Sequence, residues 1–385
     1  MPNVGMDFTL TESQKAVQDL AQSFAEKEMR PVVMKYDESQ DFPFEIVSKL
    51  AQLGFMGITV PDELGGAGLT ELEAIVIIEE LAKVDPSVAL TVASHNSLCT
   101  GHIMAFANDD QKKKYVPDLA SGRKLGAWGL TEPSSGSDAG GMKTLATRNG
   151  SDWILNGSKT FITQGSVGST YVVMAHTERG KGKESISAFI LEKGMKGFSV
   201  GKKENKLGMR CSDTATLVFE NVRVPGENLI GKVGEGFKEA LAVLDGGRIG
   251  IAALSVGIAQ AALEASVKYA KERTQFGKTL GEFQAIQWKL ADMATEISAA
   301  RLLTQRAAWM KTKGMNINLA VAQAKYFASE AAVRATNEAV QIHGGYGLIK
   351  EFPVEKLYRD VKLMTIGEGT SEVQKMVIAR NLLSM

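Results

Sequence analysis

Glu368 lies between two glycines, in the segment Ile366-Gly-Glu-Gly-Thr370 of a chain of 385 residues. Flanking glycines let the backbone approach a ligand closely and leave the carboxylate uncrowded. A carboxylate packed against an apolar ligand has its charged form disfavoured, which raises its pKa towards neutral pH. Such a group is suited to removing a weakly acidic proton from carbon. The alternative for this segment is a solvent-facing glutamate at a helix start, with Thr370 or Ser371 as the cap.

A polar loop, LTEPSSGSD at residues 130–138, is the second candidate. Pro133 and Gly136 favour a tight loop whose backbone N–H groups and hydroxyls can converge on one acceptor-rich ligand. The glycine spacing is not that of a Rossmann or P-loop phosphate site, because no strand–turn–helix pattern surrounds it. A plain connection between two elements is the alternative.

Two further segments, Arg273–Gly277 and Gln341–Gly347, could hold phosphates. Arg273 offers a planar fork for a pyrophosphate, and the glycines of the second segment allow backbone contact with a phosphate or an adenosine edge. The alternatives are an arginine that compensates a helix dipole and glycine C-caps.

Histidine and cysteine give weaker signals. His95, Cys99 and His102 follow helical spacing but lack a carboxylate motif, so we expect no metal site. Cys99 and Cys211 are the only cysteines and neither has a neighbouring base. We therefore expect neither a thiol nucleophile nor a disulfide, which fits a reducing compartment.

Composition narrows the class of protein. Lys+Arg and Asp+Glu are equal at 44 each, so we expect no nucleic acid partner. Residues 1–10 lack the pattern of a secretory signal, and the apolar stretch Ile249–Ala262 is broken by Gly and Gln and falls short of a membrane span. We expect an intracellular protein, in a bacterial cytoplasm rather than as a mature mitochondrial-matrix form.

Periodicity divides the chain into three blocks, which we place at 1–123, 124–232 and 233–385. The first is helical, with capping boxes at Thr11–Gln14 and Thr70–Glu73. The second has short β-branched and aromatic runs at 152–155, 159–163, 171–175, 186–191 and 216–219, and its Asn156-Gly157 pair predicts a hairpin turn. The third has long helical segments near 235–272, 282–313 and 317–343 and a last helix from Ser371. An α+β fold follows, with a helical domain, a β domain that is barrel-like or, alternatively, a sandwich, and an antiparallel four-helix bundle.

Seven motifs occur in a fixed order along the whole chain. They are PDELGGAG, LTEPSSGSD, LNGSKTFIT, LDGGRIGIAA, RTQFGKTLGEFQAIQ, QIHGGYG and EGTSEVQ. Because it has these motifs in this order, the sequence resembles the acyl-CoA dehydrogenase family from the first helix to the last. The family's fold, a helical domain, a β domain and a helical bundle, agrees with the three blocks.

The resemblance implies FAD as the cofactor and an acyl-CoA as the substrate. The implied flavin positions are Trp128, Leu130, Thr131, Gly136, Ser137, Phe161, Thr163, Thr370 and Glu372. The positions implied to hold the adenosine diphosphate half are Arg273, Gln275, Phe276, Gln284, Gln341 and Gly345. In the family these last residues come from a neighbouring subunit, which implies a homotetramer. The implied substrate positions are Ser137, Asp245, Arg248 and Gly369.

The family places its catalytic base at one of two positions. One of them is Gly247 here and cannot act as a base, whereas Glu368 occupies the other. Gly367 stands where many members have Tyr, so the acyl chain length cannot be transferred from the family.

The reaction implied is α,β-dehydrogenation of an acyl-CoA to the trans-2-enoyl-CoA. Glu368 would take the α-proton, flavin N5 would accept the β-hydride, and an electron-transfer flavoprotein would accept the electrons. The Glu368 N–H and a ribityl hydroxyl would bind the thioester carbonyl. An acyl-CoA oxidase, a nitroalkane oxidase or a flavin monooxygenase on the same fold is the alternative, and a non-catalytic scaffold is a further one.

Overall fold

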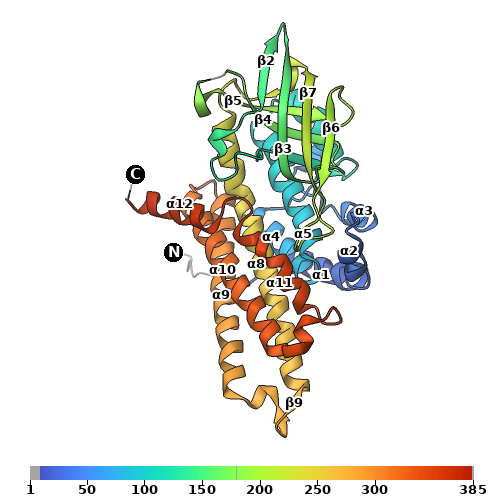
Figure 1. Cartoon of the computed structure of the whole chain (residues 1–385), viewed down its shortest axis with the longest axis vertical. Coiled ribbons are helices and arrows are strands. Elements are labelled where there is room, and N and C mark those ends of the chain that lie inside the picture. Colours follow the sequence, from blue (N-terminus) through green and yellow to red (C-terminus); the bar gives the residue numbers. More distant parts are fainter. Residues whose placement is uncertain (1–8, 179, 384–385) are drawn as a thin grey trace.

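The computed structural model describes residues 9–178 and 180–383. The N-terminal stretch for which we expected no secretory signal therefore lies almost wholly outside the described residues. Figure 1 shows a β domain at one end of the molecule and long helices that extend away from it. A single helix, α8 (Gly236–Glu272), runs from the β domain to the opposite end.

The first region is helical, as predicted. Its helices are α1 (Glu12–Phe24), α2 (Val33–Ser39), α3 (Phe44–Gln52), α4 (Glu71–Val84), α5 (Pro86–Ser94), α6 (Gly101–Phe106) and α7 (Asp109–Ala120). Both predicted capping boxes form, at Thr11 and at Thr70. Asp85 ends α4 and caps α5 by accepting from the Ser87 N–H.

The middle region is an eight-stranded sheet. Its strands are β1 (Gly126–Gly129), β2 (Leu145–Asn149), β3 (Asp152–Thr163), β4 (Thr170–His176), β5 (Ile186–Glu192), β6 (Phe198–Lys203), β7 (Thr214–Val224) and β8 (Leu229–Ile230). The strand order is β6-β7-β3-β2-β4-β5-β8, and β1 pairs in parallel with β4. All five predicted β runs lie within these strands.

The hairpin predicted at Asn156-Gly157 is wrong. The chain passes through this pair without turning, and the two runs on either side are one strand, β3. The pairing of β3 with β7 shifts its register here, and the Asn221 N–H donates to Asn156 Oδ1 at 2.8 Å, as in a β-bulge. The turn lies earlier, between Asn149 and Asp152, where a second Asn-Gly pair joins β2 to β3.

The C-terminal region contains the three predicted long helices, α8, α9 (Gln284–Thr312) and α10 (Asn318–His343). Two short strands, β9 (Thr274–Gln275) and β10 (Lys278–Thr279), connect α8 to α9. A short helix that was not predicted, α11 (Val354–Asp360), precedes the final helix α12 (Ser371–Leu383).

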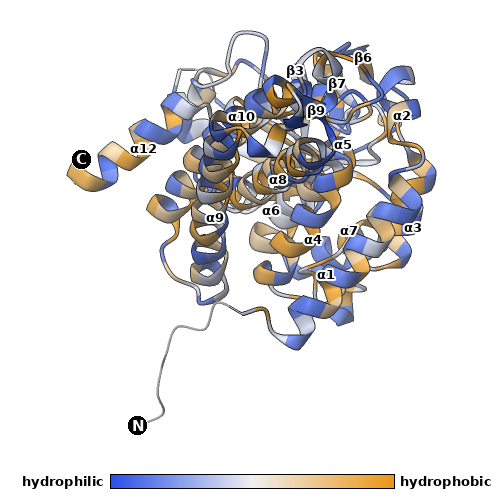
Figure 2. Cartoon of the chain, turned by 90° about the horizontal axis from the view of Figure 1, so that it is seen from below, coloured by the Kyte–Doolittle hydropathy of each residue, from blue (hydrophilic) through white to orange (hydrophobic). Residues whose placement is uncertain are grey.

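Helix α8 is the centre of the helical core. Figure 2 shows it surrounded by α4, α9 and α10. Among the described residues it is the one helix long and apolar enough to span a membrane, but 78% of its apolar window is buried inside the protein. A β-carbon at Gly257 would overlap with the Glu79 carbonyl of α4, so glycine permits close packing of the two helices.

A buried ionic cluster joins the three regions. The Lys356 ammonium donates to Asp85 Oδ1 at 2.9 Å and to Asp360 Oδ2 at 2.6 Å. The Met209 N–H, from the β domain, donates to Asp360 Oδ1 at 2.5 Å. The neighbouring carboxylates raise the pKa of Lys356 against the opposing effect of its burial. This cluster fixes the β domain relative to α11 and to the segment that leads to Glu368.

Candidate active site

The backbone at Glu368 has an unusual conformation, with φ at 54°. Its carbonyl accepts hydrogen bonds from Arg248 Nε at 3.2 Å and from Gln374 Nε2 at 3.3 Å. The next residue, Gly369, has φ at 100°, and its carbonyl accepts from Lys325 Nζ at 2.7 Å. Two left-handed residues in sequence are strained unless held, and these donors from α8, α10 and α12 hold them.

Gly247 of α8 faces the Glu368 carboxylate. A β-carbon at residue 247 would overlap with Glu368 Oε2, so any side chain at this position would displace the carboxylate. Within the described residues Oε2 is buried and has no hydrogen-bond partner. The structure thus provides a carboxylate oxygen that is withdrawn from water and free to accept a proton.

Burial raises the pKa of Glu368 to about 7. Arg248, Lys325 and Lys311 oppose this effect because their positive charges favour the carboxylate. The residue as a whole is half-buried, but the unpaired oxygen is fully buried, and that oxygen determines the effect of desolvation. A carboxyl with this pKa can both accept and release a proton near neutral pH.

Asp245 and Arg248, two of the predicted substrate residues, lie on α8 beside Glu368. Arg248 is buried, and its Nη1 donates to Asp245 Oδ1 at 2.5 Å. Asn318 Nδ2 also donates to Asp245, at 3.1 Å. This network orients the Arg248 guanidinium towards the Glu368 carbonyl.

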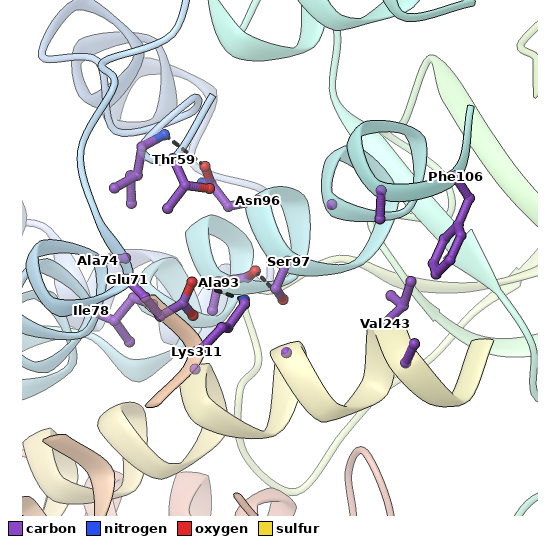
Figure 3. Close-up of a pocket in the computed structure, with 16 residues that line it drawn as sticks. Thr59, Glu71, Ala74, Ile78, Ala93, Asn96, Ser97, Phe106, Val243 and Lys311 are labelled. Atoms are coloured by element: carbon purple, nitrogen blue, oxygen red, sulfur yellow. Dashed lines mark hydrogen bonds and ion pairs between the residues drawn. The ribbon is translucent and has the colours of Figure 1, made fainter. Parts of the chain in front are cut away.

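A cavity of about 160 Å³ lies along the same stretch of α8 (Figure 3). Most of its wall is apolar, and includes Ala74, Ile78, Ala93, Phe106, Val243 and Gly250. An ion pair forms one side, where Lys311 Nζ lies 2.8 Å from Glu71 Oε2. The cavity is suited to a short apolar chain with a polar group at one wall.

Five of the predicted flavin residues lie together on the β domain. The Thr160 N–H of β3 donates to the Thr131 carbonyl at 2.9 Å, which holds the 130–132 segment beside Phe161. The Phe161 side chain is 65% exposed and its φ is 57°. The remaining three are Trp128 and Leu130, both buried, and Thr163, half-buried. An exposed ring beside a hydroxyl fits a planar aromatic ligand such as a flavin.

Buried side chains of the β domain support the surface that contains Thr131 and Phe161. The Lys159 ammonium is fully buried and donates to Glu132 Oε1 at 2.7 Å and to the Leu130 carbonyl at 3.1 Å. Burial lowers the pKa of Lys159 to about 8, although Glu132 opposes the change. Gly136 and Ser137 are exposed further along the same loop.

The residues considered for a metal site do not converge. Trp128 Nε1 donates to His102 Nδ1 at 3.1 Å, and His102 Nε2 lies 3.3 Å from Glu239 Oε2. His95 accepts from the Gly126 N–H at 3.0 Å, and Cys99 Sγ contacts the Thr170 carbonyl at 3.6 Å. No group of three potential metal ligands is found in residues 9–178 and 180–383. These side chains instead connect the helical region to β1 and β4.

The residues expected to hold the adenosine diphosphate half lie at the far end of α8, where β9 is labelled in Figure 1. Arg273, Gln275 and Gly345 line an open pocket of about 500 Å³, and the Arg273 guanidinium lies 5.4 Å from the Tyr346 ring centre. The other three, Phe276, Gln284 and Gln341, are exposed, and the exposed fraction of Phe276 is 93%.

The length of α8 separates these residues from the base. The rise of a helix places Arg273 about 40 Å from Arg248. One chain therefore does not bring this set to Glu368, whose carbonyl accepts from Arg248.

Thr370 and Glu372 lie at the start of α12, next to Glu368. Thr370 Oγ1 accepts from the Val373 N–H at 3.3 Å, so the capping role considered for this residue is present. Ser371 Oγ donates to Glu330 Oε1 at 2.5 Å, and Glu372 is exposed. The helix start therefore fixes the segment that carries Glu368.

Sequence models of three acyl-CoA dehydrogenase domains match the chain in order. The N-terminal domain matches residues 11–123, the middle domain residues 127–222 and the C-terminal domain residues 234–383. The chain belongs to the acyl-CoA dehydrogenase family. It is an oxidoreductase, and the fold class expected from the resemblance is confirmed.

Individual acyl-CoA dehydrogenases are similar along their whole length. The short-chain specific enzyme of Clostridium acetobutylicum is 48% identical over 97% of this chain and 99% of its own. The solved butyryl-CoA dehydrogenase of Megasphaera elsdenii is 47% identical with a TM-score of 0.96, covering 98% of this chain and 100% of that one. A solved chain described under the electron transferring flavoprotein of Acidaminococcus fermentans is 49% identical with a TM-score of 0.97, covering 99% and 100%.

Sequence reasoning missed several groups of this candidate site. Glu71 and Lys311 are charged residues at helix ends, where such residues are common, and nothing in the sequence relates one to the other. Lys325 and Lys159 are lysines buried within regular elements, and only the packing of distant segments reveals their roles. Burial of a lysine has no sequence signature, so a single sequence offers no means of finding either.

Proposed function

We propose that this protein binds FAD and dehydrogenates an acyl-CoA between its α and β carbons to give the trans-2-enoyl-CoA, with Glu368 as the base. The observation that carries this proposal is the buried, unpaired Glu368 Oε2, which faces Gly247 close to an apolar cavity. Gly246, which lines the cavity, is the neighbour of Gly247 on α8, so we place the acyl chain in the cavity with its α-carbon towards this oxygen.

Glu368 performs the proton transfer in this proposal. Its pKa of about 7 leaves a substantial deprotonated fraction at neutral pH, and the neutral acid formed after proton transfer is favoured by the same burial. Within the described residues the Glu368 N–H donates to no protein group. It is thus available to the thioester carbonyl, where such a donor contributes about 3 kcal/mol to an enolate-like transition state.

The cofactor assignment is supported by the fit of the residues. The exposed Phe161 ring, with Thr131 and Thr163 beside it, offers a face and hydroxyls for the ring system, and Thr370 and Glu372 lie beside the base. FAD, when bound, would supply the hydride acceptor for the β-carbon. Ser137 and Gly369 remain proposed contacts of the acyl-CoA.

We propose that a second copy of the chain completes this site. Arg273, Gln275 and Gly345 lie about 40 Å along α8 from the base, and this separation supports binding of the adenosine diphosphate half by the far end of a partner chain. We therefore propose a homo-oligomer, in the form of a tetramer. We also propose an electron-transfer flavoprotein as the acceptor and the bacterial cytoplasm as the location, in line with the bacterial relatives.

An anaerobic titration of the purified holoenzyme tests the function. Butyryl-, isobutyryl-, hexanoyl- and octanoyl-CoA are added in turn while the flavin absorbance near 450 nm is followed. Bleaching by at least one thioester, and its absence with Glu368→Gln, supports the proposal. Flavin that no thioester reduces contradicts it, and rapid reoxidation of the reduced enzyme by oxygen indicates an oxidase instead.

A further inference from the structure

The ion pair at the wall of the cavity lies at two helix ends of suitable polarity. Glu71 is in the first turn of α4, where a negative charge is favoured by the helix dipole. Lys311 is in the last turn of α9, where a positive charge is favoured. The Glu71 side chain is 13% exposed and that of Lys311 37%, so the carboxylate is the more enclosed partner.

Consecutive glycines of α8 bring this pair near the base. A β-carbon at Gly246 would lie 3.0 Å from Lys311 Nζ, and one at Gly247 would overlap with Glu368 Oε2. The ammonium and the base therefore pack against neighbouring residues of the same helix. Figure 3 shows Glu71 and Lys311 on one side of the cavity and Phe106 and Val243 on the other.

We infer that Glu71 and Lys311 select the acyl group, admitting short uncharged chains and excluding chains that end in a carboxylate. This inference rests on the proposed function. Lys311 alone would attract a terminal carboxylate, but Glu71 already neutralises it at 2.8 Å and adds a negative charge that repels a second carboxylate. Selection thus comes from Glu71 as much as from the apolar lining.

The size of the cavity agrees with a short chain. At about 160 Å³ it is comparable to an engineered protein cavity of about 150 Å³ that holds benzene, a molecule of six carbons. A longer chain would have to pack against the ion pair and remove water from it. The desolvation of the pair costs more free energy than the burial of one more methylene group contributes.

The first test compares the wild type with Glu71→Gln, which leaves the Lys311 ammonium without its partner. Pentanoyl-CoA and glutaryl-CoA have the same chain length and differ in the terminal carboxylate. We expect Glu71→Gln to shift the kcat/KM ratio of anaerobic flavin reduction towards glutaryl-CoA by at least about tenfold. Glu12→Gln, in the first turn of α1, is the matched control and should leave the ratio unchanged.

Binding is measured separately, by calorimetry of both thioesters with the holoenzyme. Glu71→Gln should bind glutaryl-CoA at least about tenfold more tightly than the wild type does, with little change for pentanoyl-CoA. If no thioester reduces the wild-type flavin, the proposed function fails, and this binding comparison still decides the inference. Equal affinities in wild type and variant would overturn it.

A second variant protects the test against misfolding of the first. Glu71→Leu combined with Lys311→Met replaces the ion pair by apolar side chains of similar size. We expect the double variant to gain at least about tenfold in octanoyl-CoA binding relative to butyryl-CoA. An unchanged ratio of the two affinities would show that the pair does not limit the acyl chain.

Discussion

The carboxylate of Glu368 occupies the space that a side chain at Gly247 would need. The two residues are far apart in sequence, and they meet because α8 packs against the segment that precedes α12. In the family the base occurs at one or other of these positions. Their contact gives a physical reason, since a side chain at the first position would displace the carboxylate at the second.

Gly247→Ala should therefore disable the base while the fold is retained. The added methyl group would move the Glu368 carboxylate, and we expect kcat to fall by at least about a hundredfold because proton transfer requires close alignment. Gly281→Ala is the control, since its methyl group lies away from the cavity and would make only ordinary contact with the Ala270 carbonyl. Equal kcat values for the two variants, measured by stopped-flow flavin reduction, would contradict the assigned contact.

Glu368→Gln should lower kcat by several orders of magnitude and leave FAD bound, because the amide cannot accept the proton.

Glu368→Gln should also stabilise the protein above neutral pH. A carboxyl whose pKa is raised on folding weakens the folded state as pH rises from about 4.5 to about 7, and the cost is then on the order of 3 kcal/mol. Urea denaturation at pH 8 measures this gain, with Glu63→Gln as an exposed control.

The pH profile should reveal the cations around the base. For the wild type we expect kcat/KM to rise with pH and level off above about 7, following deprotonation of Glu368. Lys325→Met removes a positive charge that favours the carboxylate, so its inflection should move to higher pH. Lys325→Arg keeps the charge and should restore the inflection towards the wild-type value. A purely structural role for Lys325 would lower the rate without moving the inflection.

His95 should make the fold sensitive to acid. Burial lowers its pKa to about 4, and the Gly126 N–H donates to its Nδ1, so the folded state holds the ring neutral. This stability is complete above the unfolded pKa of about 6.5 and is lost as pH falls towards 4, with a loss of about 2 kcal/mol by pH 5. Urea denaturation at pH 7 and pH 5 should show a smaller difference for His95→Gln than for the wild type or His176→Gln.

Much of the architecture could be predicted from local patterns. Helical periodicity and the capping boxes at Thr11 and Thr70 depend on neighbouring residues, and both formed as expected. The hairpin at Asn156-Gly157 failed because pairing with β7 outweighs the turn preference of two residues. The loop at Glu368 was recognisable from its glycines. The Glu71–Lys311 pair was not, because it depends on how α4 and α9 pack against α8.

The separation of Phe161, on β3 of the β domain, from Arg273, at the C-terminal end of α8, has a consequence for handling the protein. Under the proposed assignment each FAD bridges two copies, so cofactor retention and subunit association form one linked equilibrium. Dilution would then release FAD, and added FAD would hold the copies together. An exposed residue such as Phe276, 93% exposed in one chain, would be shielded only in the assembled, cofactor-loaded form. Loss of yellow colour on a sizing column would thus report dissociation as well as cofactor loss.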